Sequence, residues 1–151
     1  MDTASFPRLF ANSQKALMKN LEGITHDESL IQPIAGNCLN WVVGHLVWGR
    51  NKILEILKEP PAIAKETAER YKRGSDPMQS AGEATPFADL LSALERSQKQ
   101  VQEALAPDSQ KAPALTPEDS ENLGTLFFHE GYHVGQTGIL RRLIGKEGAI
   151  R

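Results

Sequence analysis

Two histidines four residues apart are the side chains of this chain best suited to chemistry. They occur in FHEGYHVGQTG, residues 128–138, where Glu130 directly follows His129 and His133 completes the spacing H-E-x-x-H. If the stretch is helical, both imidazoles lie on one face about 6 Å apart along the axis, because an α-helix turns about 100° per residue. Both rings can then reach one ion, since zinc takes histidine nitrogens at about 2.1 Å. The spacing indicates a metal site or, as the alternative, two histidines that only pack.

A third histidine lies within another apolar helical pattern. In residues 37–58, one side of the predicted helix carries His45 between two tryptophans. Imidazoles that project inward from two helices can share an ion, and three protein ligands with open positions are typical of a reactive metal. His45, His129 and His133 are therefore the predicted metal ligands. Core histidines that are hydrogen-bonded to other groups are the alternative. A buried imidazole without such a partner costs roughly 1–3 kcal/mol of stability, and a shared ion would relieve this cost.

The H-E-x-x-H spacing is also the zinc signature of many metallopeptidases, in which the glutamate acts as general base. Their third ligand often lies downstream, but the only acidic residue after His133 is Glu147, beyond the helix-ending Gly145. The sequence also lacks a strand pattern that could hold a substrate backbone. We therefore favour a different metal site. Glu130 lies about 100° round the helix from His129, so it is predicted as a solvated or interface glutamate or, alternatively, as a base or partner of the site.

Hydrophobic periodicity predicts four long helices and one short helix. The long helices are predicted over residues 5–23, 37–58, 85–105 and 122–144, and the short one over residues 63–71. Ser5 and Thr85 are predicted N-caps, each followed by a proline in the first turn. No strand or hairpin pattern interrupts these segments. The sequence therefore predicts an all-α fold, a four-helix bundle formed by one domain over residues 1–151.

The bulk composition suits one globular domain. The chain has 151 residues, of which 40% are hydrophobic and 24% are charged. The net charge of -2 argues against a nucleic-acid partner, because that affinity depends on clustered Lys and Arg. No apolar run approaches the ~20 residues that cross a membrane, and the start MDTASFPRLF is unlike a secretion signal. Cys38, the only cysteine, is expected to be a buried thiol, and these features together favour a cytoplasmic setting.

The two histidine segments together resemble one protein family. NCLNWVVGHLVWGRNKIL at residues 37–54 and FFHEGYHVGQTGILRRLIGKEGA at residues 127–149 look like the DinB-like (damage-inducible) superfamily of metal-binding four-helix bundles. YKRGSDP and TPFADLLSALERSQ, which lie between them, are also similar to segments of its members. The likeness spans nearly the whole chain in the expected order, and HVGQTGILRRLIG is its most specific part.

The resemblance implies both a fold and a site. The fold is a bundle with one long crossover connection, frequently a homodimer. The family's metal triad, which holds a divalent ion such as zinc or nickel, falls on His45, His129 and His133. Gln136 matches a glutamine common after the last ligand, and we assign it with Glu130 as a candidate catalytic residue. The family name reflects induction by DNA damage and does not imply DNA binding.

Two chemistries follow from a divalent ion on three neutral histidines. The ion can lower the pKa of a low-molecular-weight thiol from about 8.5, so that the thiolate attacks an electrophilic small-molecule substrate. Alternatively, it can lower the pKa of bound water toward ~7 and serve a hydrolase. Relatives with assigned activities include bacterial thiol S-transferases and mycothiol-dependent maleylpyruvate isomerases, which favours thiol transfer. A non-catalytic, stress-related helical binding protein with a structural metal, or without a metal, is the third interpretation.

Other residues near the predicted ligands have more ordinary expected roles. Trp41 and Trp48 are expected to pack in the core, with lining of a substrate cavity as the alternative. Gln136 is expected either to orient a ligand or to form a simple core hydrogen bond. His26 lies in a polar loop and is expected to be exposed. The loop at residues 72–86 is expected to border the mouth of the site, because of its length and composition.

Overall fold

The computed structural model describes residues 5–33, 36–76, 83–106, 109 and 113–150, and these residues form six α-helices and no strand. The helices are α1 Phe6–Leu21, α2 His26–Ser29, α3 Leu39–Ile56, α4 Lys65–Glu69, α5 Phe87–Ala104 and α6 Pro117–Leu143. The predicted all-α fold is therefore confirmed for this part of the chain. Within it, no helix combines the length and the apolar character that a membrane span requires.

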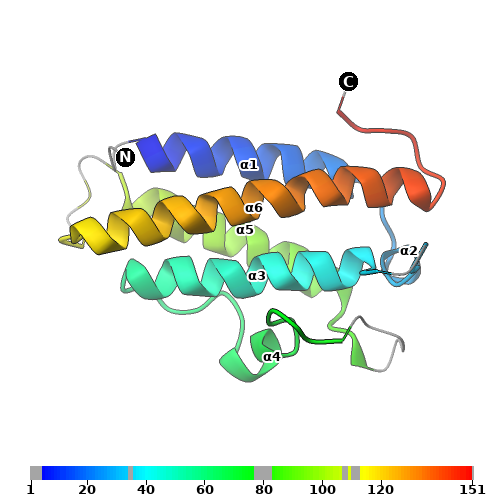
Figure 1. Ribbon diagram of the computed structural model, residues 1–151, viewed down its shortest axis with the longest axis horizontal. Coiled ribbons are helices and arrows are strands. Elements are labelled where there is room, and N and C mark those ends of the chain that lie inside the picture. The colour runs from blue at the N-terminus through cyan, green and yellow to red at the C-terminus, as the bar shows by residue number, and fades with distance from the viewer. Residues whose placement is uncertain (1–4, 34–35, 77–82, 107–108, 110–112, 151) are drawn as a thin grey trace.

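The long helices α1, α3, α5 and α6 lie side by side along the length of the molecule (Figure 1). α1 contacts α5 and α6, and α3 contacts the same two helices. Figure 1 shows that α3 and α5 run in one direction while α1 and α6 run in the other. Because α3 and α5 are parallel neighbours, the chain between them has to return along their length. The short helix α4 lies in this returning connection.

Capping residues explain why two helices begin at positions that the hydrophobic pattern does not predict. α6 begins at Pro117, earlier than predicted, because Thr116 and Asp119 form a capping box. In it, the Thr116 hydroxyl accepts the Asp119 N–H at 3.1 Å, and the Asp119 carboxylate accepts the Thr116 N–H at 2.9 Å. A second capping box, between Thr25 and Glu28, starts α2 within a predicted loop. Both starts carry a threonine followed three residues later by an acid, a signal that the periodicity does not contain.

The two predicted N-caps have different outcomes. Ser5 occupies the N-cap position of α1, but its side chain forms no capping hydrogen bond. The N-cap of α5 is Pro86, so the prediction of Thr85 as the cap is wrong. The Thr85 backbone has other partners: its N–H donates to the Tyr71 hydroxyl at 2.9 Å, and its carbonyl accepts from Asn40 at 3.0 Å. These contacts with Tyr71 and with Asn40 of α3 hold the start of α5.

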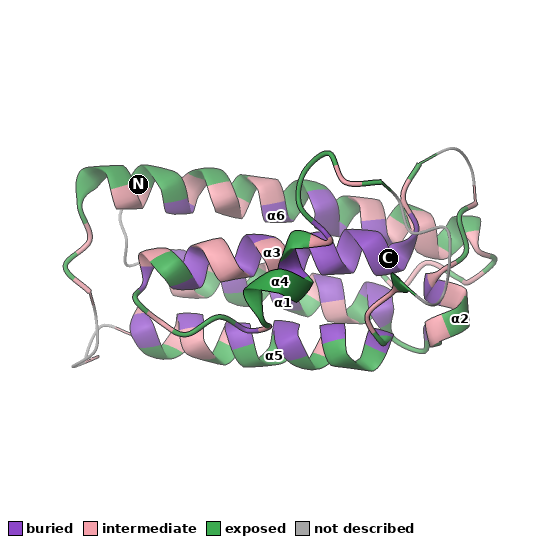
Figure 2. Ribbon diagram, turned by 90° about the horizontal axis from the view of Figure 1, so that it is seen from below, coloured by how far each residue is buried: buried purple, intermediate pink, exposed green. Residues whose placement is uncertain are grey.

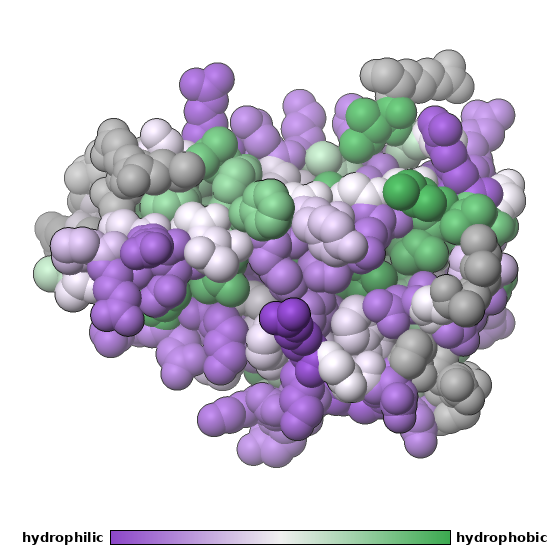
Figure 3. Space-filling model, viewed as in Figure 1, coloured by the Kyte–Doolittle hydropathy of each residue, from purple (hydrophilic) through white to green (hydrophobic). Residues whose placement is uncertain are grey.

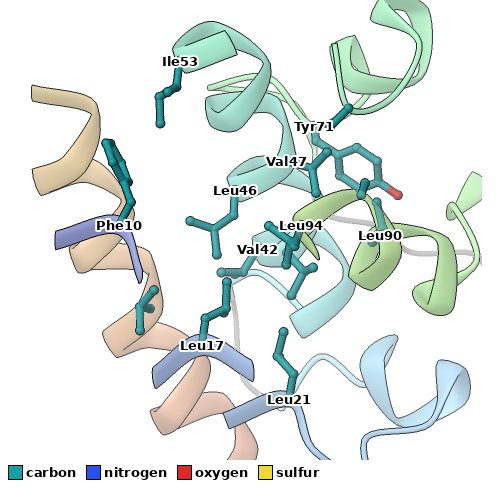
Figure 4. Close-up of a cluster of buried hydrophobic side chains, with 14 of the residues drawn as sticks. Phe10, Leu17, Leu21, Val42, Leu46, Val47, Ile53, Tyr71, Leu90 and Leu94 are labelled. Carbon is teal, nitrogen blue, oxygen red and sulfur yellow. The ribbon is translucent and has the colours of Figure 1, made fainter. Parts of the chain in front are cut away.

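Apolar side chains from the four long helices fill the space between them (Figure 4). α3 is buried along most of its length (Figure 2). A helix that is apolar on nearly all sides is expected to lie in the core. Cys38, just before α3, is buried as predicted, and burial raises the pKa of its thiol. α3 is therefore a largely buried helix against which α5 and α6 pack.

Polar contacts hold α6 against α1. The buried Asn20 side chain donates to the Val134 carbonyl at 3.2 Å and to the Thr137 hydroxyl at 3.1 Å. Arg141 donates to the backbone oxygens of Asn20 at 3.0 Å and Glu22 at 2.6 Å. These contacts lie at and beyond the histidine segment of α6, so they help to fix where that segment lies relative to the core.

The connection between α3 and α5 is held by Tyr71, whose side chain is fully buried. Its hydroxyl donates to the Asn40 side chain at 3.1 Å and accepts the Thr85 N–H at 2.9 Å. Its ring lies directly on the backbone of α3 at Gly44, where any Cβ would overlap the ring. The Tyr71 ring can lie this close to α3 only because residue 44 is a glycine. The same contact brings the Tyr71 backbone next to α3.

We expect Gly44→Ala to lower the free energy of unfolding by about 2 kcal/mol, because the added methyl group would force the Tyr71 ring out of a packed core. Urea denaturation of the purified protein measures this change. The matched control is Gly124→Ala on α6, where a Cβ would meet no atom within 4 Å. This control should be as stable as the wild type or more stable by up to about 1 kcal/mol. Equal stability of Gly44→Ala and wild type would contradict the packing described for Tyr71.

Candidate metal centre

Three imidazoles converge between α3 and α6. His45 on α3 and His129 and His133 on α6 place their ligand nitrogens within 4.8 Å of one another. The ring centroids of His129 and His133 lie 4.5 Å apart, and each lies 4.8 Å from that of His45. The Nε2 atoms of His45 and His129 are separated by 2.9 Å. The structure thus brings together the three ligands predicted from two distant segments.

Two of the rings are held at Nδ1 by hydrogen-bond acceptors. His45 Nδ1 lies 2.6 Å from the Tyr71 backbone oxygen, and His133 Nδ1 lies 2.7 Å from the Gln136 side-chain oxygen. Because both partners accept, Nδ1 carries the proton in each neutral ring and Nε2 keeps its lone pair. A histidine that binds a metal through Nε2 needs this tautomer, and the same hydrogen bond orients its ring.

Two tryptophans sandwich the His45 ring. Trp41 stacks on it at a centroid distance of 4.8 Å and an angle of 13°, and Trp48 stacks on the other side at 5.3 Å and 10°. Trp41 belongs to the hydrophobic core and Trp48 packs against that core while half-buried, as the packing interpretation predicts. The two indoles shield His45 from water and restrict its rotation.

Burial keeps the three imidazoles neutral. Burial is the largest effect that lowers the pKa of His129 to about 4, and positive charges on His133, His45 and Arg73 add to it. Burial also lowers the pKa of His45 and of His133, against the opposing effect of the hydrogen bond at each Nδ1. A neutral imidazole has the free lone pair that a metal requires, so no proton has to be displaced near neutral pH.

The donor set fits a divalent metal ion. It consists of three neutral nitrogen ligands, and no carboxylate or thiol of the described residues joins the cluster. Imidazole suits zinc, nickel and copper, and three protein ligands leave coordination positions open. The three histidines can therefore hold a divalent ion whose charge the ligands do not neutralise.

The histidines lie at the edge of the buried face of α6. The buried residues of this helix are Leu123, Glu130, His133, Val134 and Thr137. His129 is half-buried, and Leu143 is 47% exposed. Residue spacing puts Leu143 on the same stripe of the helix as the histidines, so its exposure shows that α6 is rotated toward the Glu130 side. The rotation leaves one side of the cluster near the surface, which access by a small molecule requires.

Glu130 lies in the core and pairs with Arg50. It is 3% exposed, and its two oxygens accept from Arg50 Nε at 2.6 Å and Nη2 at 2.8 Å. The prediction of a solvated glutamate is therefore wrong, because the fully buried Arg50 guanidinium requires a counter-charge. The assignment of Glu130 as a catalytic residue stays a prediction, although both of its oxygens already bind Arg50.

Arg50 also contacts the two remaining long helices. It donates to Gln98 on α5 at 2.8 Å and to Gln14 on α1 at 3.5 Å. Its guanidinium carbon lies 5.2 Å from the ring centroid of Phe10. Sequence reasoning did not identify Arg50, because Lys52 and Glu55 of the same helix are also charged and their side chains are exposed, so residue type does not single out the buried charge.

Gln136 and His26 have distinct positions. Gln136 accepts from His133 Nδ1, and its amide nitrogen donates to the Tyr132 hydroxyl at 3.3 Å. Of the two roles expected for Gln136, contact with a predicted ligand is the one observed, while its catalytic assignment stays a prediction. His26 is half-buried and accepts the Phe87 N–H at 3.2 Å. The prediction that His26 is exposed is wrong, because it holds the first residue of α5.

The loop at residues 72–86 borders the site at its described beginning. Tyr71 immediately precedes it and holds His45, and the Ser75 hydroxyl accepts from the Trp41 indole at 3.0 Å. Residues 77–82 lie outside the described part of the chain. The contact at Tyr71 could not be found from residue types, because its partner atom is a backbone oxygen.

Comparison with known proteins identifies no relative of this chain. No family model, no curated protein and no solved structure matches the chain. The site is therefore defined by its own geometry, and the resemblance to the DinB-like superfamily stays a prediction.

We expect removal of either charge of the ion pair, in Arg50→Met or Glu130→Leu, to lower the free energy of unfolding by about 3–5 kcal/mol, because the other charge remains buried and unpaired. The free energy of unfolding should fall much less in the double variant than the sum of the two single losses, since the double variant has no unpaired charge. Urea denaturation of all four proteins measures the coupling. Strictly additive losses would contradict a buried ion pair.

The metal-free protein should become less stable as the pH falls from about 6.5 toward 4. His129 has an ordinary pKa of 6.5 when the chain is unfolded and a pKa of about 4 when it is folded. In this window the unfolded chain binds more protons, so its protonation favours unfolding, whereas above pH 6.5 this contribution is constant. Urea denaturation of chelator-treated protein between pH 4 and 8 measures the slope. It should be smaller in His129→Gln, and an equal slope would contradict the lowered pKa.

Proposed function

We propose that this protein is a metal-dependent enzyme that binds a divalent ion at His45, His129 and His133 and transfers a small thiol to an electrophilic small molecule. The observation that supports it is the convergence of three imidazoles from two helices, with ligand nitrogens within 4.8 Å. His45 and His133 place their Nδ1 protons on acceptors outside the cluster. The Nε2 atoms of His45 and His133 therefore both carry lone pairs, and only His129 has an N–H that could be donated to one of them. A shared cation would instead accept a lone pair from each of the three rings.

The proposal includes the fold, a four-helix bundle with one long crossover connection like that of the DinB-like superfamily. Each of α1 and α3 contacts both α5 and α6, which is the neighbour pattern of such a bundle. The parallel direction of α3 and α5 supports assigning the crossover to the connection that contains α4 (Figure 1).

The bound ion would lower the pKa of a thiol, so that thiolate exists near neutral pH. In the transfer, the thiol proton leaves to solvent and the sulfur lone pair forms a new C–S bond. The bond from that carbon to its leaving group breaks, and the leaving group departs with the electron pair. Within the protein, Tyr71 and Gln136 hold two of the rings in the required tautomer, and the tryptophans exclude water from the His45 side.

The proposal extends to a homodimer formed through α6. This helix exposes Phe128 by 76%, Tyr132 by 60%, Ile139 by 62% and Leu143 by 47%. Apolar groups gather on the face of the molecule that α6 crosses (Figure 3). Their spacing is symmetric about the middle of the segment, so a second antiparallel copy of α6 would pair aromatic with aliphatic side chains in both halves. Exposed apolar patches of this kind are typical of interaction surfaces.

Elemental analysis of the purified protein should find one divalent ion per chain. We expect His45→Ala, His129→Ala and His133→Ala each to lose this ion, since each change removes one of three ligands. The control is His26→Gln, which changes the fourth histidine of the sequence and should keep the metal. The wild type should also consume monochlorobimane only when a thiol is added, and the three alanine variants should lose this turnover.

Two outcomes would favour the other functions. Thiol-independent cleavage of ester, amide or phosphoester substrates by the metal-loaded protein would indicate a hydrolase at the same site. A metal-free protein whose three histidine variants melt as the wild type does would indicate a non-catalytic helical binding protein. Absence of turnover with several different thiols would contradict the transferase proposal directly.

A further inference from the structure

A β-turn at residues 72–75 presents an arginine next to the candidate metal centre. The Ser75 N–H donates to the Lys72 carbonyl at 3.1 Å and closes the turn. Gly74, at its third position, has φ of 80°, the conformation for which a type II turn requires glycine. Arg73 is the second residue of this turn, at its exposed corner, so its side chain is free to extend.

Both ends of this turn are bound to the His45 side of the site. Two residues before Arg73, the Tyr71 carbonyl accepts from His45 Nδ1 at 2.6 Å. Two residues after it, the Ser75 hydroxyl accepts from the indole of Trp41 at 3.0 Å, and this indole stacks on His45. Arg73 is therefore held between Tyr71, which contacts His45, and Ser75, which contacts Trp41.

The charge of Arg73 has no counter-charge among the described residues, whereas its basic neighbours are paired. Arg70 pairs with Glu83 at 3.6 Å, and Lys72 pairs with Glu69 at 3.7 Å. Arg73 forms no ion pair with any carboxylate in the described part of the chain. The acid nearest in sequence to the α6 ligands, Glu130, is already paired with Arg50.

Arg73 can reach the region of the His45 ring. It follows Tyr71 by only two residues, a span of about 7 Å at most, and the Tyr71 carbonyl oxygen lies 2.6 Å from His45 Nδ1. A divalent ion on the neutral triad would add a second positive charge to the same region. Two uncompensated cations in one region attract an anion that can lie between them, and a guanidinium matches a carboxylate with two parallel hydrogen bonds.

We propose that Arg73 binds a carboxylate group of the small molecule that reacts at the His45, His129 and His133 site. This inference rests on the proposed function and narrows its substrate class to molecules with an anionic group near the reacting atom. The carboxylate can belong to the thiol or to the electrophile. These two sources share one chemistry, and the experiment below separates them.

The thiol is tested by binding to the cobalt-loaded protein, in which thiolate coordination gives a charge-transfer absorption band. The probes are 3-mercaptopropionate and 3-mercapto-1-propanol, which match in length and differ in charge. We expect Arg73→Gln to weaken binding of the carboxylate probe about tenfold while binding of the alcohol is unchanged, as loss of one charge-assisted contact predicts. The control Lys72→Gln removes the neighbouring charge of the same turn and should bind both probes as the wild type does.

The electrophile is tested by turnover with 3-mercapto-1-propanol as the thiol and either iodoacetate or iodoacetamide as the acceptor. If the electrophile carries the carboxylate, Arg73→Gln should lower kcat/KM for iodoacetate about tenfold relative to iodoacetamide. A selective loss in either arm supports the proposal and identifies the source. Equal effects on the charged and neutral probes in both arms would overturn it.

Failure of the proposed function gives a different result, because the protein would then bind no cobalt. In that case the metal-free protein is titrated with 3-mercaptopropionate, and binding is followed by the fluorescence of Trp41 and Trp48, which both stack on His45. Saturable binding that Arg73→Gln abolishes and Lys72→Gln preserves would still support an anion site at Arg73. Absence of binding to the wild type would overturn it.

Discussion

The buried ion pair between Arg50 and Glu130 sets how α3 lies against α6, and the histidine cluster depends on this alignment. Glu130 directly follows His129 in α6, and Arg50 lies in α3 a little more than one turn after His45. An unpaired charge in the core would be costly, so the two helices are held in the register in which both oxygens of Glu130 reach the guanidinium. The same register places His45 beside His129. Gln14 and Gln98 extend the network to α1 and α5, so one polar side chain from every long helix takes part in it.

The connection between α3 and α5 supplies part of what surrounds the histidines. Because α3 and α5 are parallel neighbours, the chain must travel back along α3 before α5 begins (Figure 1). Gly44 allows the Tyr71 ring to lie on α3, and this contact brings the Tyr71 carbonyl to His45. The topology of the fold thus explains why the Tyr71 backbone, which belongs to neither helix of the cluster, holds one of its rings.

The position of the histidines at the edge of a buried face balances two requirements. Burial lowers the pKa of all three rings and keeps them neutral, which metal binding needs. Complete burial would also exclude any small molecule. The rotation of α6 toward Glu130 leaves His129 half-buried, so the cluster combines a dry side, formed by the tryptophans, with a side near the surface.

The sequence by itself determined the helical character of the chain and the three histidines that could act together. Helical periodicity is a local property, and the spacing of His129 and His133 places them on one face in any α-helix. The two capping boxes are also local signals, since each consists of a threonine and an acid three residues later in the sequence.

Only the tertiary structure decided the partners of these side chains. That Glu130 is buried against Arg50, that Leu143 faces outward and that the Tyr71 backbone holds His45 all depend on how one helix is rotated against another. A periodic pattern limits that rotation to a broad arc, whereas a hydrogen bond requires positions accurate to a few tenths of an ångström. Such accuracy arises only when all the packed elements restrain one another.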